Sequence, residues 1–169
     1  MNDKQRPLVA AGTVLGAGLG GFVDGILFHQ LLQIHNMLTG RLPKDTIPNV
    51  EVNMFWDGIF HAGTWILTAV GVWLLFRAAQ RRDTVLTTKS FVGSLAVGWG
   101  LFNLVEGLID HHILHLHHVV ERLGVSAWDV AFLASGVVLI GVGWMAIRAD
   151  GRAPQLQSRP GATPAPQYR

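Results

Sequence analysis

The chain has 169 residues, of which 50% are hydrophobic and 14% are charged, against about 25% charged residues in an average soluble domain. Its mean hydropathy is +0.35, which favours a lipid bilayer over water as the surrounding medium. The absence of cysteine excludes disulfides, thiolate metal sites and iron–sulfur clusters. The isoelectric point near 9.5 does not indicate nucleic acid binding, because the basic residues flank apolar runs, so we expect the lipid bilayer and no nucleic acid as a partner.

Four apolar runs follow one another along the chain. Each is longer than the ~20 residues that a helix needs to cross ~30 Å of hydrocarbon. The sequence therefore predicts an all-α fold, an integral membrane four-helix bundle over residues 1–149. The expected helices cover about residues 8–36, 54–78, 90–119 and 126–148.

Basic residues are distributed unequally between the two ends of these helices. Ten Lys or Arg residues lie with the two termini and the 77–90 segment, and three lie at the other end. The positive-inside rule then places both termini in the cytoplasm of a bacterial inner (plasma) membrane. Residues 150–169 are rich in Pro, Gln and Arg, and we expect them to form a disordered cytoplasmic tail.

Two segments of the chain resemble each other. DGILFHQLLQIHNM begins at Asp24, and EGLIDHHILHLHHV begins 82 residues later at Glu106. Both follow an acid-Gly-x3-His-x5-His pattern, and the next helix starts with Trp-Asp in each case, at Trp56 and Trp128. These matches predict two tandem two-helix repeats. Because each repeat has an even number of spans, the pseudo-two-fold axis should follow the membrane normal.

Histidines and acids concentrate at the end of the bundle opposite the termini. All eight histidines fall in the outer half of the predicted helices or at the outer surface. Ionisable groups inside a bilayer are costly, so we expect them to face the bundle interior and to pair. Without cysteine, the set offers nitrogen and oxygen ligands, which suit Zn, Fe, Mn or Cu(II); haem is a second candidate cofactor. The candidate metal ligands are His29, His35, Asp57, His61, Glu106, Asp110, His111, His115 and His117.

Four further polar residues are candidates for orienting these ligands through hydrogen bonds or for passing protons. They are Asp24, Asn103, His118 and Asp129. Within the third helix, an α-helical wheel places His111 beside the acids and His112 nearly opposite, so we expect His112 to be solvated.

Three motifs carry a resemblance to a known family: GLGGFVDGILFHQLLQIHNM, FWDGIFHAGTW and GLFNLVEGLIDHHILHLHHV. They resemble a bacterial family of small predicted membrane proteins classed as a domain of unknown function, and the resemblance covers about residues 8–148. It implies a natural four-helix unit and no particular chemistry. The His111/His115 spacing is also similar to one cluster of membrane di-iron hydroxylases and desaturases. The other histidine clusters of those enzymes are missing from this chain. Those enzymes also hold their metals on the cytoplasmic side, whereas the histidines of this chain are expected on the opposite side.

The sequence leaves three functions open, and it does not decide whether the protein is an enzyme. The first is an extracytoplasmic-facing site for a transition metal or haem, used in metal handling or redox chemistry with a respiratory or metal-handling membrane partner. The second is a proton- or ion-coupled channel or transporter that uses the acid and histidine side chains as a relay. Against it, residues 68–76 and 91–101 offer few polar steps. The third is a scaffold subunit of a membrane complex, and a homo-oligomer is compatible with each.

Overall fold

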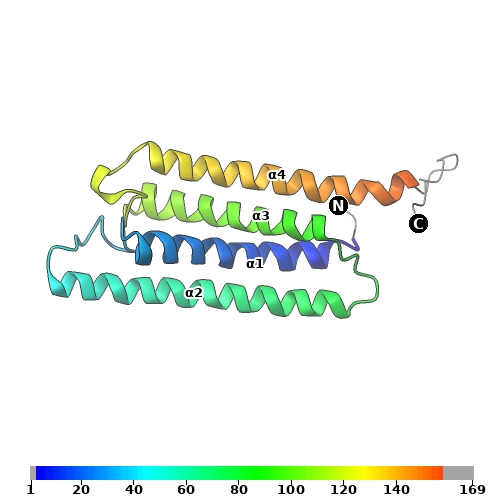
Figure 1. Cartoon of the computed structure of the whole chain (residues 1–169), viewed down its shortest axis with the longest axis horizontal. Helices are drawn as coiled ribbons and strands as arrows, with labels where there is room; N and C mark the ends of the chain where they lie inside the picture. The colour runs from blue at the N-terminus through cyan, green and yellow to red at the C-terminus, as the bar shows by residue number, and fades with distance from the viewer. Residues whose placement is uncertain (1–2, 158–169) are drawn as a thin grey trace.

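Four long helices make up the protein in the computed structural model, which describes the backbone of residues 3–157 and the side chains of residues 3–151 (Figure 1). Two of the helices, α1 and α3, continue directly into short π-helices, η1 and η2. A 3-10 turn, η3, lies in the last loop. The elements are α1 Arg6–Asp24, η1 Gly25–Leu31, α2 Ile47–Gln80, α3 Thr88–Glu106, η2 Gly107–Ile113, η3 Glu121–Leu123 and α4 Ala127–Gln157.

Each of the four helical segments is long and apolar enough to cross a membrane. The segments are Arg6–Leu31, Ile47–Gln80, Thr88–Ile113 and Ala127–Gly151. At 1.5 Å per residue, even the shortest, with 25 residues, exceeds the ~30 Å of a bilayer core. The protein is therefore all-α, with four candidate spans.

The helices lie side by side in a row rather than in a closed square. Helix α1 packs against α2 and α3, and α3 packs against α4, so α1 and α3 are central and α2 and α4 are outer (Figure 1). The central helices are the more buried pair: half of the most apolar stretch of α1 is buried, against 11% of the corresponding stretch of α2. The outer helices present large apolar side chains such as Trp65, Trp73 and Met145 to the surroundings, as lipid-facing helices do.

Glycines set the close approach of the two central helices. A Cβ added to Gly16 would lie 2.8 Å from the Cα of Leu95, and one added to Gly98 would lie 2.8 Å from the backbone nitrogen of Ala17. Real Cβ atoms do not come this near to backbone atoms, so only glycine fits at either position. Small residues at helix crossings are how membrane helices pack, since lipid gives apolar faces no reason to pair.

The helical segments that carry the histidines end earlier than the apolar runs suggest. They stop at Leu31 and Ile113, whereas we expected residues 36 and 119. The π-helices widen the last turns, and the backbone then takes a positive φ of 51° at Gln33 and 48° at His115. Helix α4 in turn extends to Gln157, so the first residues of the expected tail are helical. The rest of that tail, 158–169, lies outside the described residues.

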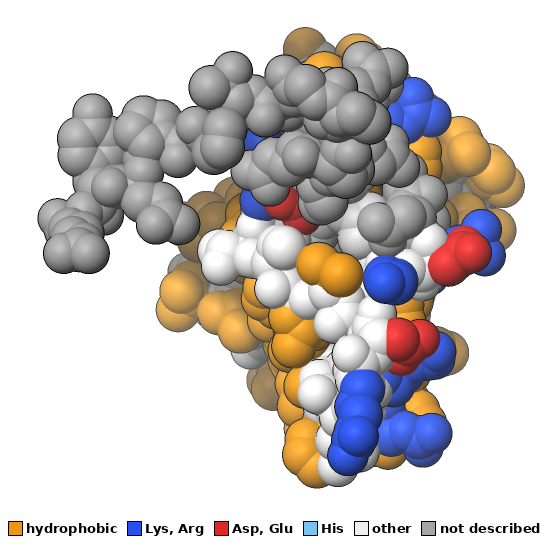
Figure 2. Space-filling view, turned by 90° about the vertical axis from the view of Figure 1, so that its right-hand side faces the viewer, with side chains coloured by type: hydrophobic (Ala, Val, Ile, Leu, Met, Phe, Trp, Pro, Cys, Tyr) orange, Lys and Arg blue, Asp and Glu red, His pale blue; other side chains and the backbone are white. Residues whose placement is uncertain are grey.

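Lys and Arg side chains gather on the face at the end that holds the two termini (Figure 2). Just beneath it, a polar network ties three helices together: Gln5 donates to Ser90 at 3.1 Å, and Ser90 donates to Asp150 at 2.6 Å. The histidine cluster lies at the opposite end, at the loops 32–46 and 114–126 (Figure 1). The two ends of the protein therefore differ in both charge and chemistry.

Candidate metal centre

The first part of the site is a histidine held between two carboxylates. His29 in η1 places its Nδ1 2.9 Å from Asp57 Oδ1 and its Nε2 3.3 Å from Asp24 Oδ2. All three side chains are buried. Asp57 is fixed further by the backbone N–H of Met37, which donates to its Oδ1 at 2.8 Å, and by the side chain of Asn36. The imidazole of His29 is thus immobilised by acids from two helices.

The second part has the same design in the other half of the chain. His111 in η2 places its Nε2 3.0 Å from Glu106 Oε1 and its Nδ1 3.2 Å from Asp129 Oδ1. Asp129 is held by the backbone N–H of Val119, which donates to Oδ1 at 3.0 Å, and by Ser126. In both halves, an acid of the central helix and an acid of the outer helix enclose one imidazole.

Two further histidines come from the loops and join the halves. His35 Nδ1 donates to the carbonyl of Val119 at 3.0 Å, and His117 Nδ1 donates to the carbonyl of Met37 at 3.2 Å. The two rings stack on each other with centroids 4.6 Å apart and an interplanar angle of 16°. Each loop thus bonds to the backbone of the other loop, and both rings are buried between the halves.

His35 is a neutral imidazole. Burial lowers its pKa to about 2, and the neighbouring rings of His117 and His29 act in the same direction. Because its Nδ1 carries the proton that is donated to Val119, its Nε2 has a free lone pair. A neutral imidazole with one nitrogen hydrogen-bonded and the other free is the form that binds metals.

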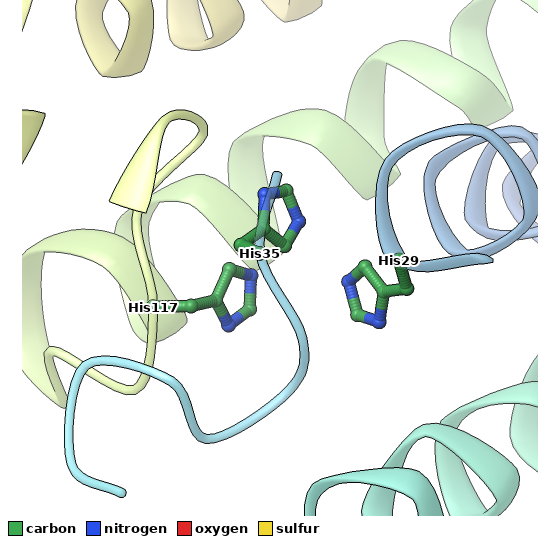
Figure 3. A group of neighbouring side chains, drawn as sticks. All are labelled: His29, His35 and His117. Atoms are coloured by element: carbon green, nitrogen blue, oxygen red, sulfur yellow. The ribbon is translucent and has the colours of Figure 1, made fainter. Parts of the chain in front are cut away.

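Ligand atoms converge at two places in this cluster. His29, His35 and His117 form one group, and Glu106, His111 and His117 form the other; within each group the ligand atoms lie within 4.8 Å of one another. Figure 3 shows that the first group comes from three separate segments, η1 and the two loops. Around a tetrahedral ion with bonds of 2.0–2.1 Å, ligand atoms are roughly 3.4 Å apart, so small side-chain movements would complete either group.

Several of these atoms are buried and lack a hydrogen-bond partner among the described residues. Polar atoms are rarely left in this state inside proteins, and each instance calls for an explanation such as an ion. Seven such atoms belong to side chains of the cluster: Asp24 Oδ2, His29 Nε2, His35 Nε2, Glu106 Oε2, His111 Nδ1, His111 Nε2 and His118 Nδ1. Nitrogen and oxygen donors of this kind fit Zn, Fe, Mn or Cu(II).

The structure leaves four of the candidate ligands outside both groups. One is Asp57, which flanks His29 instead, and the other three are farther from the groups. His61 is half-buried and donates its Nδ1–H to its own helix at Asp57 O, 2.7 Å away. Asp110 is half-buried and lines an apolar pocket of about 340 Å³. His115 is exposed on the loop, where the positive φ turns the chain away from the helix.

The candidates for supporting roles occupy three kinds of position. Asp24 and Asp129 flank His29 and His111 directly. His118 reaches Asp129 from the loop, with its Nδ1 3.5 Å from Oδ1. Asn103 is more remote and links α3 to α4 by donating to Ser135 at 2.9 Å. His112 is half-buried, and its Nδ1 donates to its own backbone at Gly107 O, 2.8 Å away.

Comparison with known proteins gives a family but no chemistry. Residues 11–150 match the family DUF2243, described as "Predicted membrane protein". The chain belongs to this family. The match confirms the resemblance that the histidine motifs indicated. The DUF2243 family has no established function.

One curated relative shows a partial similarity. The chain is 32% identical over 92 residues to a cellobiose-specific EIIC component of a PTS system from Geobacillus stearothermophilus. The match covers 54% of this DUF2243 chain and spans only 19% of that protein, which is too little to indicate a shared activity. No solved structure matches the chain.

Three residues that support the site were not among the sequence-based candidates. Asn36 donates to Asp57 and to the carbonyl of His29. Asn53 accepts from the backbone N–H of Leu38 at 3.0 Å. Glu121 accepts from the backbone N–H of His118 at 3.0 Å. Asn36 lies 82 residues before His118, so the internal similarity offered a clue to its place. Asn53 lies four residues before Asp57 and therefore on the same face of its helix, whereas no sequence pattern pointed to Glu121.

A pocket connects the cluster with the loop surface. It has a volume of about 380 Å³ and is lined by His29, Gln33, Asn36, Lys44 and Met54, among others. His29 is the one histidine of the cluster in the lining of this pocket.

Proposed function

We propose that this protein binds a transition metal ion in the His/carboxylate cluster, for metal handling or redox chemistry. One observation carries the proposal. Four buried imidazoles, those of His29, His35, His111 and His117, each place Nδ1 next to a carboxylate or a backbone carbonyl. The Nε2 atoms of His29, His35 and His111 have no hydrogen-bond partner among the described residues, and Nε2 of His117 lies 2.9 Å from Glu106 Oε1. Metal-binding histidines have this arrangement almost without exception, because the acceptor fixes the ring and raises its basicity.

The spacing of the rings favours a bare ion over haem. His35 and His117 stack at 4.6 Å, and the centroids of His29 and His35 are also 4.6 Å apart. A macrocycle bound axially by any two of these rings would have to lie between them, and stacked rings leave no such space. Zn, Fe, Mn and Cu(II) all accept the available nitrogen and oxygen donors.

The decisive experiment measures metal binding in the purified protein. We expect stoichiometric metal by mass spectrometric elemental analysis after dialysis against micromolar Zn(II), Cu(II), Mn(II) or Fe(II), and no Soret band. His111→Ala should lose metal, while the matched control His112→Ala should retain it, because the imidazole of His112 is bonded to its own helix. Equal occupancy in both variants, or no metal in the wild type, would reject the proposal.

The location proposed for the protein is a bacterial inner membrane with both termini in the cytoplasm. The excess of Lys and Arg at the end with the termini supports this orientation, and it opens the pocket at His29 to the extracytoplasmic side. Since the chain has no cysteine, single cysteines at Thr46 and Asp83 give a clean test. An impermeant thiol reagent added to whole cells should label Thr46→Cys and not Asp83→Cys; the reverse pattern would invert the orientation.

A proton- or ion-coupled channel or transporter is the second candidate. The chain of imidazoles and carboxylates from Asp24 to Asp129 favours it, since such chains act as proton relays in membranes. Beyond the cluster, however, the buried hydroxyls of Thr64 and Ser94 donate to carbonyls of their own helices and form no continuous path among the described residues. Proteoliposomes with an internal pH dye should show no proton flux above that of empty vesicles; flux abolished by Glu106→Gln would favour the relay.

The origin of the site in two tandem hairpins is also a proposal. It is supported by features that recur at the 82-residue offset: the π-helices begin at Gly25 and Gly107, and the positive φ angles fall at Gln33 and His115. The loop histidines make equivalent hydrogen bonds to each other's half. A crystal or cryo-electron microscopy structure in which residues 6–80 superpose on residues 88–151 by a rotation of about 180° along the membrane normal would support it; a rotation about another axis would reject it.

Partners and assembly complete the proposal. The apolar side chains on α2 and α4, such as Trp65 and Trp144, are available to lipid, to a second copy or to a respiratory or metal-handling membrane protein. A role as a scaffold subunit would use the same faces. Native mass spectrometry of the protein released from nanodiscs distinguishes a monomer from a homo-oligomer. A complex that stays intact after a chelator has removed its metal would favour a scaffold role, in which the metal is not needed for assembly.

A further inference from the structure

We infer that a basic pocket at the end of the bundle opposite the histidines binds the phosphate group of an anionic phospholipid. The pocket has a volume of about 230 Å³ and lies between the start of α1 and the end of α2. Arg77 and Arg81 line it, together with Trp73 and apolar residues of both helices. The inference does not depend on the proposed metal centre, which shares none of these residues.

The charge of the pocket favours an anion. Its lining contains two arginines and no acid. Pro7, in the first turn of α1, is part of the lining, so the positive end of that helix dipole lies beside the arginines. Lys and Arg side chains gather on this end of the protein (Figure 2). Guanidinium groups bind phosphate through paired hydrogen bonds and stay protonated in proteins, so the argument from charge needs no assumption about protonation.

Arg77 is available to an incoming anion. Its guanidinium carbon lies 5.4 Å from the centroid of the Trp73 ring, which comes one turn earlier on α2. This cation–π contact holds the guanidinium in place. Within the described part of the chain, the Arg77 side chain has no hydrogen bond or ion pair. Its N–H groups can therefore all be used for a ligand.

Arg81 brings a second guanidinium to the same pocket, four residues further along. Its Nε and Nη2 each lie 3.3 Å from an oxygen of Asp83, and both of these side chains are more than half exposed. Exposed ion pairs of this kind are weak, so Asp83 does not prevent an anion from approaching. Because residues four apart are neighbours on a helix, one phosphate can contact both arginines.

The rest of the pocket favours a lipid over a free phosphate ion. The walls away from the arginines are apolar, and they are formed by Pro7, Ala10, Leu74 and Ala78. A hydrated ion gains nothing from covering apolar walls, whereas the glycerol and acyl parts of a lipid do.

The depth of the pocket also matches a lipid headgroup. Trp73 is 54% exposed, and exposed tryptophans of membrane helices lie at the level of the headgroups. Arg77 is four residues, or ~6 Å, nearer to the end of α2, which is where the phosphates of the bilayer are. Basic pockets between membrane helices bind anionic headgroups in this way.

The other outer helix supplies a matched control. The guanidinium carbon of Arg148 lies 4.8 Å from the centroid of the Trp144 ring, with the same four-residue spacing and at the same end of the bundle (Figure 1). Arg148 is not part of the pocket lining. A general attraction of basic residues to anionic lipid would involve both arginines, whereas a defined site involves Arg77.

Lipid retention tests the inference. The full-length protein in detergent is mixed with phosphatidylglycerol or with phosphatidylcholine of identical acyl chains, and bound lipid is counted by native mass spectrometry. We expect the wild type to retain one phosphatidylglycerol, with a preference of about 10-fold over phosphatidylcholine. Arg77→Gln should lose this preference and Arg148→Gln should keep it. Millimolar inorganic phosphate should not displace the lipid.

Photocrosslinking locates the lipid without any variant. Phosphatidylglycerol with a diazirine in its headgroup should crosslink to the wild-type protein in nanodiscs within residues 7–10 and 73–81. Equal loss of preference in Arg77→Gln and Arg148→Gln would overturn the site in favour of general surface attraction. Displacement by inorganic phosphate would overturn it in favour of a free ion, and crosslinks confined to other residues, or no preference in the wild type, would reject it outright. The proposed metal centre stands or falls separately, by its own metal analysis.

Discussion

The two halves of the site share a plan and differ by one methylene group. Asp24 in the N-terminal half reaches only His29, at 3.3 Å. Glu106, which is one carbon longer, brings Oε1 to 3.0 Å from His111 and 2.9 Å from His117 at once. The backbone of both halves presents the imidazoles in the same way, so the length of the acidic side chain decides how many imidazoles the inner carboxylate contacts. Under the proposed function, we expect the C-terminal half to bind metal more strongly than the N-terminal half.

A second difference concerns the outer acids. Asp57 accepts a hydrogen bond from the amide of Asn36, while Asp129 has the imidazole of His118 at 3.5 Å in the corresponding place. Both acids also cap a backbone N–H of the loop, that of Met37 in one half and that of Val119 in the other. These carboxylates therefore tie the loops to the outer helices as well as orienting the rings.

The largest difference between the halves should follow from neutralising the inner acids. Glu106→Gln should weaken metal binding on the order of 100-fold, because it removes the oxygen that two imidazoles share, and Asp24→Asn should weaken it about 10-fold. Competition with a chelating dye measures both affinities. Equal losses would mean that the extra methylene does not set the strength of the site.

Alanine substitutions on the two sides of the interface between the halves should lower the stability of the protein by similar amounts. Gly16→Ala and Gly98→Ala each place a methyl group against the backbone of the facing helix, and overpacking of this kind costs about 1–3 kcal/mol. Gly63→Ala is the matched control, because nothing lies within 4 Å of its added Cβ. Thermal unfolding in detergent should show lower melting temperatures for the first two variants only. A marked difference in melting temperature between Gly16→Ala and Gly98→Ala would show that the two glycines do not contribute equally to this contact.

Neutralising the outer acids, Asp57 and Asp129, should have a smaller effect on metal affinity, and one that is similar in the two halves. Asp57→Asn and Asp129→Asn should each reduce metal affinity about 10-fold, the effect expected when an imidazole loses the carboxylate that orients it. Isothermal titration with Zn(II) measures the change. We expect Asp57→Asn to be the milder of the two if Asn36 keeps the loop in place, and an effect confined to one half would show that only that half binds metal.

The smallest effect is a pH dependence from His35. Burial lowers its pKa to about 2 from the ordinary 6.5, so below pH 6.5 the unfolded chain takes up a proton that the folded chain does not. The apoprotein should therefore lose stability as the pH falls, by about 1 kcal/mol from this group between pH 7.5 and 5.8. His35→Asn, which keeps an N–H for the carbonyl of Val119, should lose less over the same range. Denaturant unfolding at the two pH values checks this; identical slopes would contradict a neutral buried His35.

Much of the fold was predictable from the sequence, because the length of an apolar run and its glycine spacing reflect the bilayer directly. The burial of Asp24, Asp57 and Glu106 was also predictable, since a charged group in a membrane has to face the protein. The departures begin where the α-helical period ends. A π-helix shifts the direction of every later side chain, so the helical wheel failed for His115, which is exposed.

The loop histidines show what sequence periodicity cannot capture. His117 is buried as expected, but it comes from a loop, and its place is fixed by a carbonyl at Met37, 80 residues away. Such a contact depends on how two hairpins dock, which no local pattern encodes. The internal similarity was the one feature that related these distant residues, because it aligned His35 with His117.

The exchange of hydrogen bonds between the two loops bears on how the protein is made. Loop 32–46 contacts loop 114–126 through His35 and Val119, Gly40 and Leu116, and His117 and Met37. When only the first hairpin has been synthesised, His35 lacks its partner Val119, and neither group of converging ligand atoms can form, because both include His117. If the protein binds a metal as proposed, it would acquire the ion late in biogenesis, after both hairpins have been inserted and docked, and a chain truncated after the first hairpin would be unable to retain it.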